Sequence, residues 1–136
     1  RQVHFALTDL RLHSQWKPEL NLTPDQLRRE IAVNTTVIDP IQDDHFLCAF
    51  GHIFAGGYSA GYYSYKWAEV LSADAFAAFE EAGLDDESRV RDIGARFRDT
   101  VLSLGGSLSP AEVFKAFRGR SASSEALIRH SGLLAV

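Results

Sequence analysis

The stretch from residue 51 to residue 65 reads GHIFAGGYSAGYYSY, a glycine-interrupted segment that runs directly into closely spaced tyrosines. Its Gly56-Gly57 pair predicts a loop, because glycine allows backbone dihedral angles and close approaches that other residues resist. No proline follows for several helical turns, so a helix is expected to begin near Tyr58. At about 100° per residue, Tyr58, Tyr62 and Tyr65 would then lie within roughly 60° of one another. The pattern predicts three phenol hydroxyls on one strip of a helix, directly behind a flexible loop.

The opposite side of this predicted helix is also apolar. It would carry Tyr63, Trp67, Val70 and Leu71, which predicts a largely buried helix. Aromatic side chains at helical spacing either pack in a core or line a binding site, and the spacing alone leaves both interpretations open. Buried phenols need hydrogen-bond partners, and a ligand would be one such partner.

Two helices are expected before the loop. Val3, Leu7 and Leu10 recur at helical spacing and predict a first helix that ends near Ser14. The second has a well-marked start, with a capping box and a proline at its first position. The residues that form this start are Thr23, Pro24 and Gln26.

The faces of the second helix follow from its residue types. Leu27 and Ile31 are assigned to its inner face. The charged residues Arg28, Arg29 and Glu30 are assigned to its solvent-facing side.

Residues 34–48 lack a clear helical pattern and are expected to form an ordered irregular segment. The β-branched run 35–38 ends at Asp39-Pro40, and no second strand is available to pair with it. Neighbouring acidic and histidine side chains raise the question of a metal site, but adjacent side chains point in different directions. A solvated loop is therefore favoured for Asp43, Asp44 and His45. The side chains expected to fold back into the core are Phe46, Leu47, Ala49 and Phe50.

Beyond the tyrosines, Gly83 predicts the end of a helix, and Asp85 to Ser88 form an acidic start for the next one. Ser109, Pro110 and Glu112 repeat the capping box. Three sets of apolar residues are expected to face inward: Val90, Ile93, Phe97, Val101 and Leu104; Val113, Phe114 and Phe117; and Leu127 and Ile128 in a short last helix. Leu133 to Val136 are expected to fray. The fold class predicted is all-α, with about six helices in one helical unit over residues 1–136.

Composition excludes several classes of protein. A net charge of −4 gives no reason to expect nucleic acid or an anionic membrane as a partner. No apolar run approaches the roughly 20 residues of a membrane span, and no signal peptide is visible. The single cysteine, Cys48, predicts a reducing compartment, and a cytoplasmic location is expected. The chain begins with Arg1 and contains no methionine, so we expect a piece of a longer polypeptide.

The chain carries no complete catalytic motif of its own. A zinc peptidase of the usual kind needs His-Glu-x-x-His, a third ligand and a carboxylate base, and here the five histidines are scattered. Neither a Gly-x-Ser-x-Gly elbow nor a phosphate-binding loop is present. By itself, the chain is not expected to catalyse a reaction.

Several motifs together resemble one enzyme family. They are His52 to Tyr65 with Lys66 to Leu71 and Asp74 to Phe76, then Phe97 to Ser107, Phe114 to Arg120 and, upstream, Phe5 to His13. Over nearly its whole length the chain is similar to the C-terminal part of the thimet oligopeptidase family of zinc metallopeptidases. The resemblance implies that the zinc-binding helix lies upstream and that this chain, inactive alone, supplies the substrate-facing wall. It implies zinc as cofactor of the intact enzyme, with no ligand from this chain, and two partners: short peptides and the N-terminal zinc-binding half.

The resemblance also implies site residues. His52, Tyr58 and Tyr65 match family positions that contact the bound peptide, and the two tyrosines hold the scissile carbonyl or its oxyanion. Tyr62 lies on the same strip as a further substrate contact, and Gly56-Gly57 matches a flexible loop over the cleft. As water on zinc attacks a peptide carbonyl, charge grows on its oxygen, and a phenol donor there lowers the barrier by a few kcal/mol. With a pKa of about 10, tyrosine stays a donor at neutral pH.

Alternatives remain open from the sequence. His52 donates to substrate or is a structural histidine, and Gly56-Gly57 forms a hinge or only packs tightly. The chain as a whole is alternatively a non-catalytic helical module that binds a peptide or protein. An upstream His-Glu-x-x-His would favour the peptidase. Within the family, Phe54-Ala55 favours an oligopeptidase over a dipeptidyl carboxypeptidase. Because the tyrosine strip would face the missing half, the isolated chain is expected to self-associate.

Overall fold

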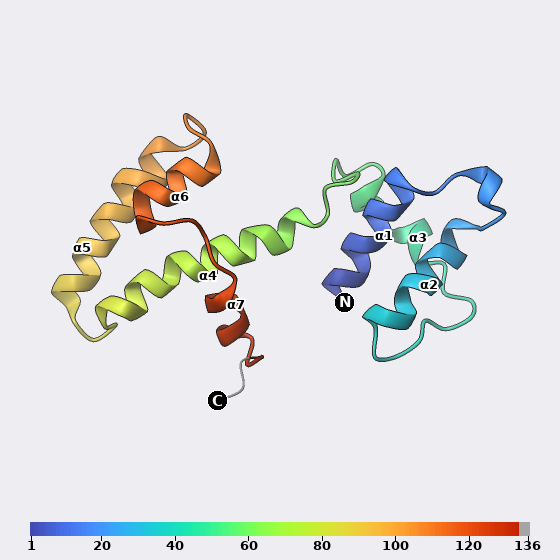
Figure 1. The fold of residues 1–136 in the computed structure, drawn as a ribbon, viewed down its shortest axis with the longest axis horizontal. Helices are drawn as coiled ribbons and strands as arrows, with labels where there is room; N and C mark the ends of the chain where they lie inside the picture. Colours follow the sequence, from blue (N-terminus) through green and yellow to red (C-terminus); the bar gives the residue numbers. More distant parts are fainter. Residues whose placement is uncertain (134–136) are drawn as a thin grey trace. The chain divides into compact units, whose positions relative to one another are not determined.

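The computed structural model describes residues 1–133 and confirms the all-α prediction, with seven α-helices and no strand in that range (Figure 1). Its contacts group into two compact units, Arg1–Lys66 and a second unit that begins at Trp67. The single unit expected from the sequence stays a prediction, and each unit is described separately below. Within residues 1–133, no helix has both the length and the apolar character that a membrane crossing requires. Fraying was predicted for Leu133 to Val136, and residues 134–136 of that range lie outside the described residues.

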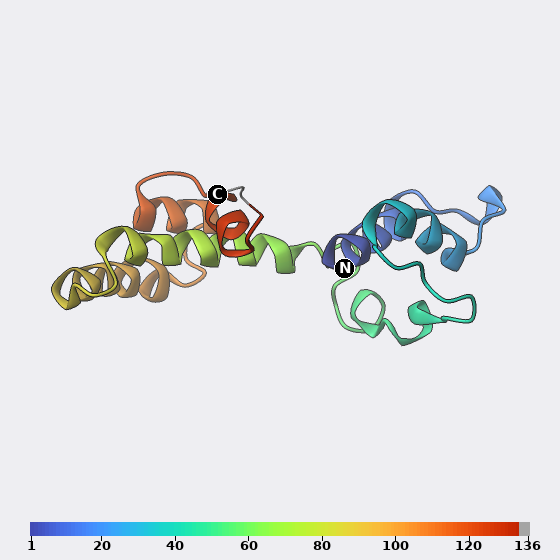
Figure 2. The ribbon, with the colours of Figure 1, turned by 90° about the horizontal axis from the view of Figure 1, so that it is seen from below.

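The first unit holds two main helices, α1 (Gln2–Ser14) and α2 (Pro24–Thr35), which lie side by side in both views (Figures 1 and 2). Between them is a 3₁₀ turn, Pro18–Leu20. The chain continues through an irregular segment to the short helix α3 (Phe46–Ala49), which the sequence did not predict, and a second 3₁₀ turn, Gly51–Ile53. Phe50, Ile53 and Tyr62 form the buried centre of this unit, with Phe5 and Phe46 packed against them. Of the residues expected to fold inward, Ala49 is exposed, so that part of the prediction is wrong.

The second unit is built on the long helix α4 (Ser64–Ala82), whose first residues precede the unit boundary. The remaining elements are α5 (Glu87–Phe97), a π-helical continuation (Arg98–Leu102), α6 (Pro110–Arg118) and α7 (Glu125–His130). Val113, Phe114 and Phe117 of α6 are buried as predicted. Ala73 and Ala77 of α4 form a second buried cluster with Ala126 of α7.

The two predicted capping boxes and the helix end at Gly83 are confirmed. Thr23 Oγ1 accepts a hydrogen bond from the Gln26 amide at 3.1 Å, and Gln26 Oε1 accepts one from the Thr23 amide at 2.8 Å. Ser109 and Glu112 form the same reciprocal cap at the start of α6. Gly83 follows α4 with φ of +88°, a conformation that glycine adopts without steric cost.

The predicted helix is confirmed, but the apolar spacing of Val3 and Leu7 does not mark the buried face of α1. Val3 is 56% exposed and Leu7 40%, whereas the buried side chains are His4, Thr8 and Asp9. Polar groups can be buried there because each finds a hydrogen-bond partner. Thr8 Oγ1 donates to the His4 carbonyl oxygen at 2.8 Å, and His4 Nδ1 lies 3.1 Å from Thr35 Oγ1 of α2. Burial and the nearby Arg28 charge lower the pKa of His4, which favours the neutral ring in this contact.

The solvent-facing position predicted for Arg28 is also wrong. Arg28 is 2% exposed, and its guanidinium donates to Asp25 Oδ1 and to Asp44 Oδ2, each at 3.0 Å. A planar guanidinium can satisfy two carboxylates at once, so a buried arginine is tolerated here. Asp44 was expected in a solvated loop, and this ion pair instead ties the irregular segment to α2.

The helix that carries the tyrosines begins later than predicted. α4 starts at Ser64, so Tyr58 and Tyr62 lie in the turns before it and not on a helical strip. Tyr63 and Trp67, expected on a buried face, are 50% and 61% exposed. Two amides of this segment, those of Ala60 and Tyr62, donate to the side chain of Asp9 on α1.

Candidate functional site

The loop before α4 is closed by its own backbone. The Gly51 carbonyl oxygen accepts a hydrogen bond from the Gly56 amide at 2.8 Å, and the His52 carbonyl oxygen accepts one from the Tyr58 amide at 3.0 Å. Ser59 Oγ donates to the Ile53 carbonyl oxygen at 2.6 Å. These bonds bring His52 and Tyr58 to the same end of the loop.

The two glycines of the loop are there for different steric reasons. A Cβ on Gly56 would lie 2.8 Å from His52 Cα and 3.0 Å from its carbonyl oxygen, which are backbone atoms that cannot rotate away. Gly57 has φ of +80°, in the left-handed region, with open space around it. Gly56 therefore allows the loop backbone to pack closely against His52, and Gly57 allows the left-handed backbone of the turn.

Asp9 fastens the next turn of the chain to α1. Its side chain is completely buried, and its two oxygens accept hydrogen bonds from the Ala60 and Tyr62 amides, each at 2.9 Å. His13 Nδ1 lies 2.9 Å from Asp9 Oδ1. Sequence reasoning missed Asp9. The available signal was an acidic side chain on a helix in the middle of an apolar segment, because such a group needs a specific partner when buried.

Four predicted site residues come together around this loop: His52, Tyr58, Tyr62 and Tyr65. We call their side chains the aromatic cluster. The Tyr65 ring centroid lies 4.9 Å from that of Tyr58, in a stacked arrangement, and 5.1 Å from that of Tyr62. The His52 ring centroid lies 6.0 Å from Tyr58 and 5.9 Å from Tyr62. The tyrosines predicted to share a helical strip therefore do meet, although only Tyr65 is on the helix.

The members of the aromatic cluster differ in exposure. Tyr62 is buried, at 8% exposed, and its ring packs edge-on against Phe50 with centroids 5.1 Å apart. Tyr58 is half-buried, whereas Tyr65 and His52 are exposed. Tyr62 thus supports the cluster from the core side, and Tyr58, Tyr65 and His52 are open to a ligand.

The chemistry available to the cluster is hydrogen-bond donation. The hydrogen bond between the Tyr58 and Tyr65 hydroxyls, together with some burial, raises the pKa of Tyr65 above its ordinary value of 10.0. Tyr65 therefore keeps its proton throughout the neutral range. Neighbouring phenols in this state can donate to a carbonyl oxygen or to an oxyanion.

No metal centre accompanies the cluster in the part of the chain that the structure describes. Residues 1–133 contain no group of three or more His, Cys, Asp or Glu side chains placed to hold a metal ion. The residues present thus do not fit a zinc ion by themselves.

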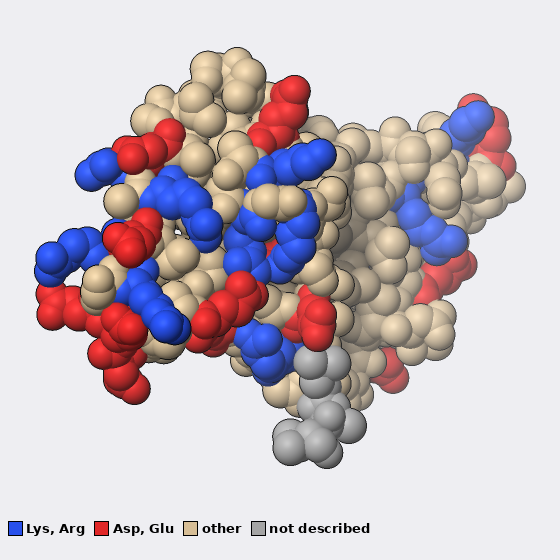
Figure 3. Space-filling view, turned by 60° about the vertical axis from the view of Figure 1, so that its left-hand side comes forward, with Lys and Arg blue, Asp and Glu red and all other residues tan. Residues whose placement is uncertain are grey.

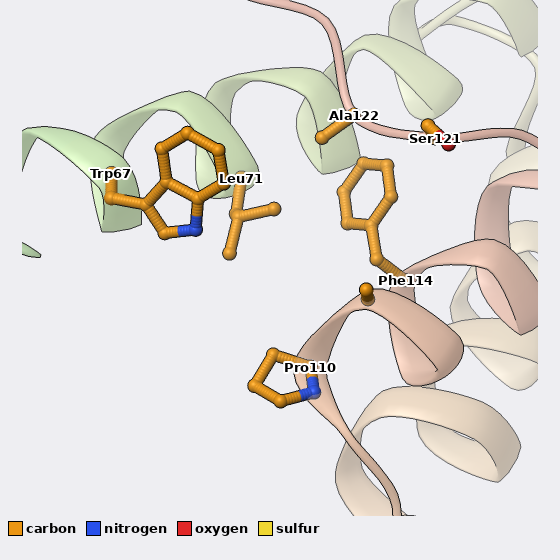
Figure 4. A pocket seen from close by; sticks show the side chains of 7 residues that line it. Trp67, Leu71, Pro110, Phe114, Ser121 and Ala122 are labelled. Atoms are coloured by element: carbon orange, nitrogen blue, oxygen red, sulfur yellow. The ribbon is translucent and has the colours of Figure 1, made fainter.

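A separate cavity lies in the second unit. Its volume is about 190 Å³, and it is lined mainly by apolar side chains from α4 and α6. Figure 4 shows Trp67 and Leu71 of α4 facing Pro110 and Phe114 of α6 across it. None of the residues predicted from the sequence as site residues lines this cavity.

Comparison with known proteins gives the chain a family. The model of "Peptidase family M3" matches residues 1–133. Two proteins of Arabidopsis thaliana, a probable cytosolic oligopeptidase A and an organellar oligopeptidase A, are each 57% identical over 135 residues, which is 99% of this chain. Oligopeptidase A of Escherichia coli is 44% identical over 133 residues, 98% of this chain.

The matched region is a minor part of those relatives. It makes up 19% of the cytosolic Arabidopsis protein, 17% of the organellar one and 19% of the E. coli protein. The resemblance seen in the sequence motifs is confirmed over almost the whole of this chain, and the chain belongs to peptidase family M3, a family of metallopeptidases.

Proposed function

We propose that this chain is the substrate-contacting, C-terminal part of a zinc-dependent oligopeptidase that hydrolyses short peptides. The observation that carries the proposal is the stacking of Tyr58 on Tyr65 at 4.9 Å, with His52 beside them, in a member of a peptidase family. A phenol hydroxyl of this pair can donate to the oxygen of a peptide carbonyl.

The proposed role of the two phenols follows from the charge that develops during hydrolysis. Addition of water to a peptide carbonyl places negative charge on its oxygen, and preorganised donors at that oxygen stabilise the transition state. Tyr58 and Tyr65 are assigned this role. The raised pKa of Tyr65 supports it, because the phenol remains a donor at neutral pH. His52 is assigned one of two roles: it donates a hydrogen bond to the substrate backbone, or it orients Tyr58. The ring centroids of His52 and Tyr58 lie 6.0 Å apart.

The remaining assignments concern the rest of the enzyme. Because residues 1–133 offer no metal-binding group, the zinc ligands are assigned to another part of the polypeptide, and this chain alone is expected to be inactive. All three relatives described above are named oligopeptidase A, which supports an oligopeptidase over a dipeptidyl carboxypeptidase. The single cysteine supports a cytoplasmic location. Self-association of the isolated chain stays a prediction.

The test is peptidase activity of the full-length protein on a short quenched peptide. Tyr58→Phe and Tyr65→Phe each remove one hydroxyl and keep the ring. We expect kcat to fall about 10²- to 10³-fold with KM little changed, the scale of losing one oxyanion donor. Tyr63→Phe is the matched control, since Tyr63 is 50% exposed and has no ring contact with the aromatic cluster among those described. Phenylalanine variants as fast as the parent would show that the cluster is only packing.

A further inference from the structure

We propose that Asp9 is a positioning residue for the aromatic cluster: by holding the amides of Ala60 and Tyr62, it keeps the chain out of helix and places Tyr58 against Tyr65. The proposal rests on the proposed function for its catalytic consequence. Its structural part stands on the geometry alone.

The burial of Asp9 calls for an explanation. A carboxylate removed from water is strongly unfavourable unless hydrogen bonds or opposite charges compensate. Asp9 is completely buried, and two of its partners are main-chain amides two residues apart in the loop, each 2.9 Å away. Its carboxylate therefore fixes the backbone of residues 60–62 through these two hydrogen bonds.

The backbone at this turn is one that the sequence does not favour. Ala60 has φ of +54°, in the left-handed region that residues other than glycine rarely adopt. The Gly61 amide donates to the Tyr58 carbonyl oxygen at 2.8 Å, which closes the turn on its other side. The hydrogen bond from the Ala60 amide to Asp9 holds this unfavourable conformation in place.

The turn bears on the spacing of Tyr58 and Tyr65. In a continuous helix from Tyr58, residues 58 and 65 would be separated by seven rises of about 1.5 Å, roughly 10 Å along the axis. The observed ring centroids are 4.9 Å apart and stacked. The left-handed turn at Ala60 lies between the two residues, and Asp9 is the side chain that reaches it from α1.

The critical substitution is Asp9→Asn in the full-length protein. Asparagine has nearly the same shape, but one of its two groups is a donor, which would face an amide N–H instead of accepting from it. We expect kcat on the quenched peptide to fall at least tenfold with KM near the parent value. Ala60→Gly added to Asp9→Asn should restore part of the lost kcat, because glycine adopts the left-handed turn without the hydrogen bond.

Asp74→Asn is the matched control for loss of a buried carboxylate. Asp74 is 1% exposed and also accepts a hydrogen bond from a backbone amide, that of Ser123 at 2.7 Å, but it lies in the second unit. At a temperature below both unfolding transitions, Asp74→Asn should leave kcat unchanged. If Asp74→Asn lowers kcat as much as Asp9→Asn does, the effect is general destabilisation and the proposal is overturned.

A second readout separates this proposal from the proposed function. With 3-fluorotyrosine at position 65, the ¹⁹F titration of Tyr65 reports its contact with Tyr58 without any need for activity. Asp9→Asn should move this titration to lower pH by releasing Tyr58, even if the phenylalanine variants prove fully active and the catalytic role is lost. An unchanged titration in a folded Asp9→Asn protein would overturn the positioning role, whatever the kinetics of the phenylalanine variants.

Discussion

Tyr58 and Tyr65 stack with their ring centroids 4.9 Å apart and an angle of 26° between their planes, although α4 begins only at Ser64. The two phenols meet because the chain turns between them, and not because they share a helical face. The pair is therefore sensitive to changes in the turn as well as to changes in the rings themselves.

The first prediction concerns the ionisation of Tyr65. The hydrogen bond with Tyr58 is the largest cause that raises the pKa of Tyr65 above 10.0, so Tyr58→Phe should lower it towards that value. A folded-state pKa above the unfolded one favours the protonated form. The contribution of the protonated Tyr65 to the free energy of unfolding is fully present below about pH 10. It is lost as pH rises through the folded-state pKa of Tyr65.

The measurement is the tyrosine titration between pH 8 and pH 12, by ¹³C or ¹⁹F labels on Tyr65. Tyr63→Phe is the control, since Tyr63 has no described ring contact with either residue. A Tyr65 titration that does not respond to Tyr58→Phe would contradict the hydrogen bond between the two hydroxyls.

The second prediction concerns the loop glycines. Gly56→Ala should lower the free energy of unfolding by about 1–3 kcal/mol, because the added Cβ meets His52 backbone atoms at 2.8 and 3.0 Å. Gly51→Ala is the matched control, since a Cβ there meets nothing within 4 Å. Urea denaturation of the two variants would measure the difference. Equal stability would mean that the loop backbone can move away from Gly56 at little cost.

The third prediction concerns acid sensitivity in the second unit. Burial by itself would raise the pKa of Asp74, but hydrogen bonds from the Arg120 side chain and the Ser123 amide outweigh it and hold that pKa below 3.8. Arg120 donates to both Asp74 oxygens, at 2.7 and 2.6 Å. Because the pKa of Asp74 is lower in the folded state, its ionised carboxylate contributes to the free energy of unfolding. This contribution is present above about pH 4 and is lost as pH falls through the folded-state pKa of Asp74.

Asp74→Asn should therefore cost about 2–4 kcal/mol at neutral pH and flatten the fall of Tm between pH 5 and pH 2. Thermal denaturation followed by circular dichroism across this range is the measurement. Asp85→Asn, at an exposed position, is the control. If Asp74→Asn loses Tm on acidification as steeply as the parent, Asp74 does not supply the acid-sensitive stability.

On the face shown in Figure 3, basic side chains (blue) and acidic side chains (red) are interspersed. Charge pairs also join different helices: Arg118 of α6 pairs with Glu81 of α4, and their closest atoms are 2.7 Å apart. Such pairs join residues far apart in sequence, so charge patterning along the chain does not reveal them.

Much of the fold was predictable where local chemistry decides it. Thr23 and Ser109 mark helix starts because their hydroxyls accept from amides three residues on. Gly83 marks a helix end because of its left-handed backbone. The resemblance to the peptidase family, confirmed by comparison, brought four site residues to attention, and the structure brings those side chains together.

The misjudged positions share one cause. Arg28 was assigned by its residue type and Asp9 was missed, and each is held by a partner far along the chain. Asp9 meets amides some 50 residues away, and Arg28 meets Asp44, 16 residues on. Local periodicity contains no information about such partners.

The sequence by itself determined the all-α class, the capped helix ends, the two-glycine loop and the membership of a peptidase family, because local backbone preferences and long motifs encode these. Tertiary structure alone decided where α4 begins and how Tyr58 reaches Tyr65. The reason is physical: the amides of Ala60 and Tyr62 donate to the buried carboxylate of Asp9 on α1, a partner some 50 residues away that local sequence does not reveal.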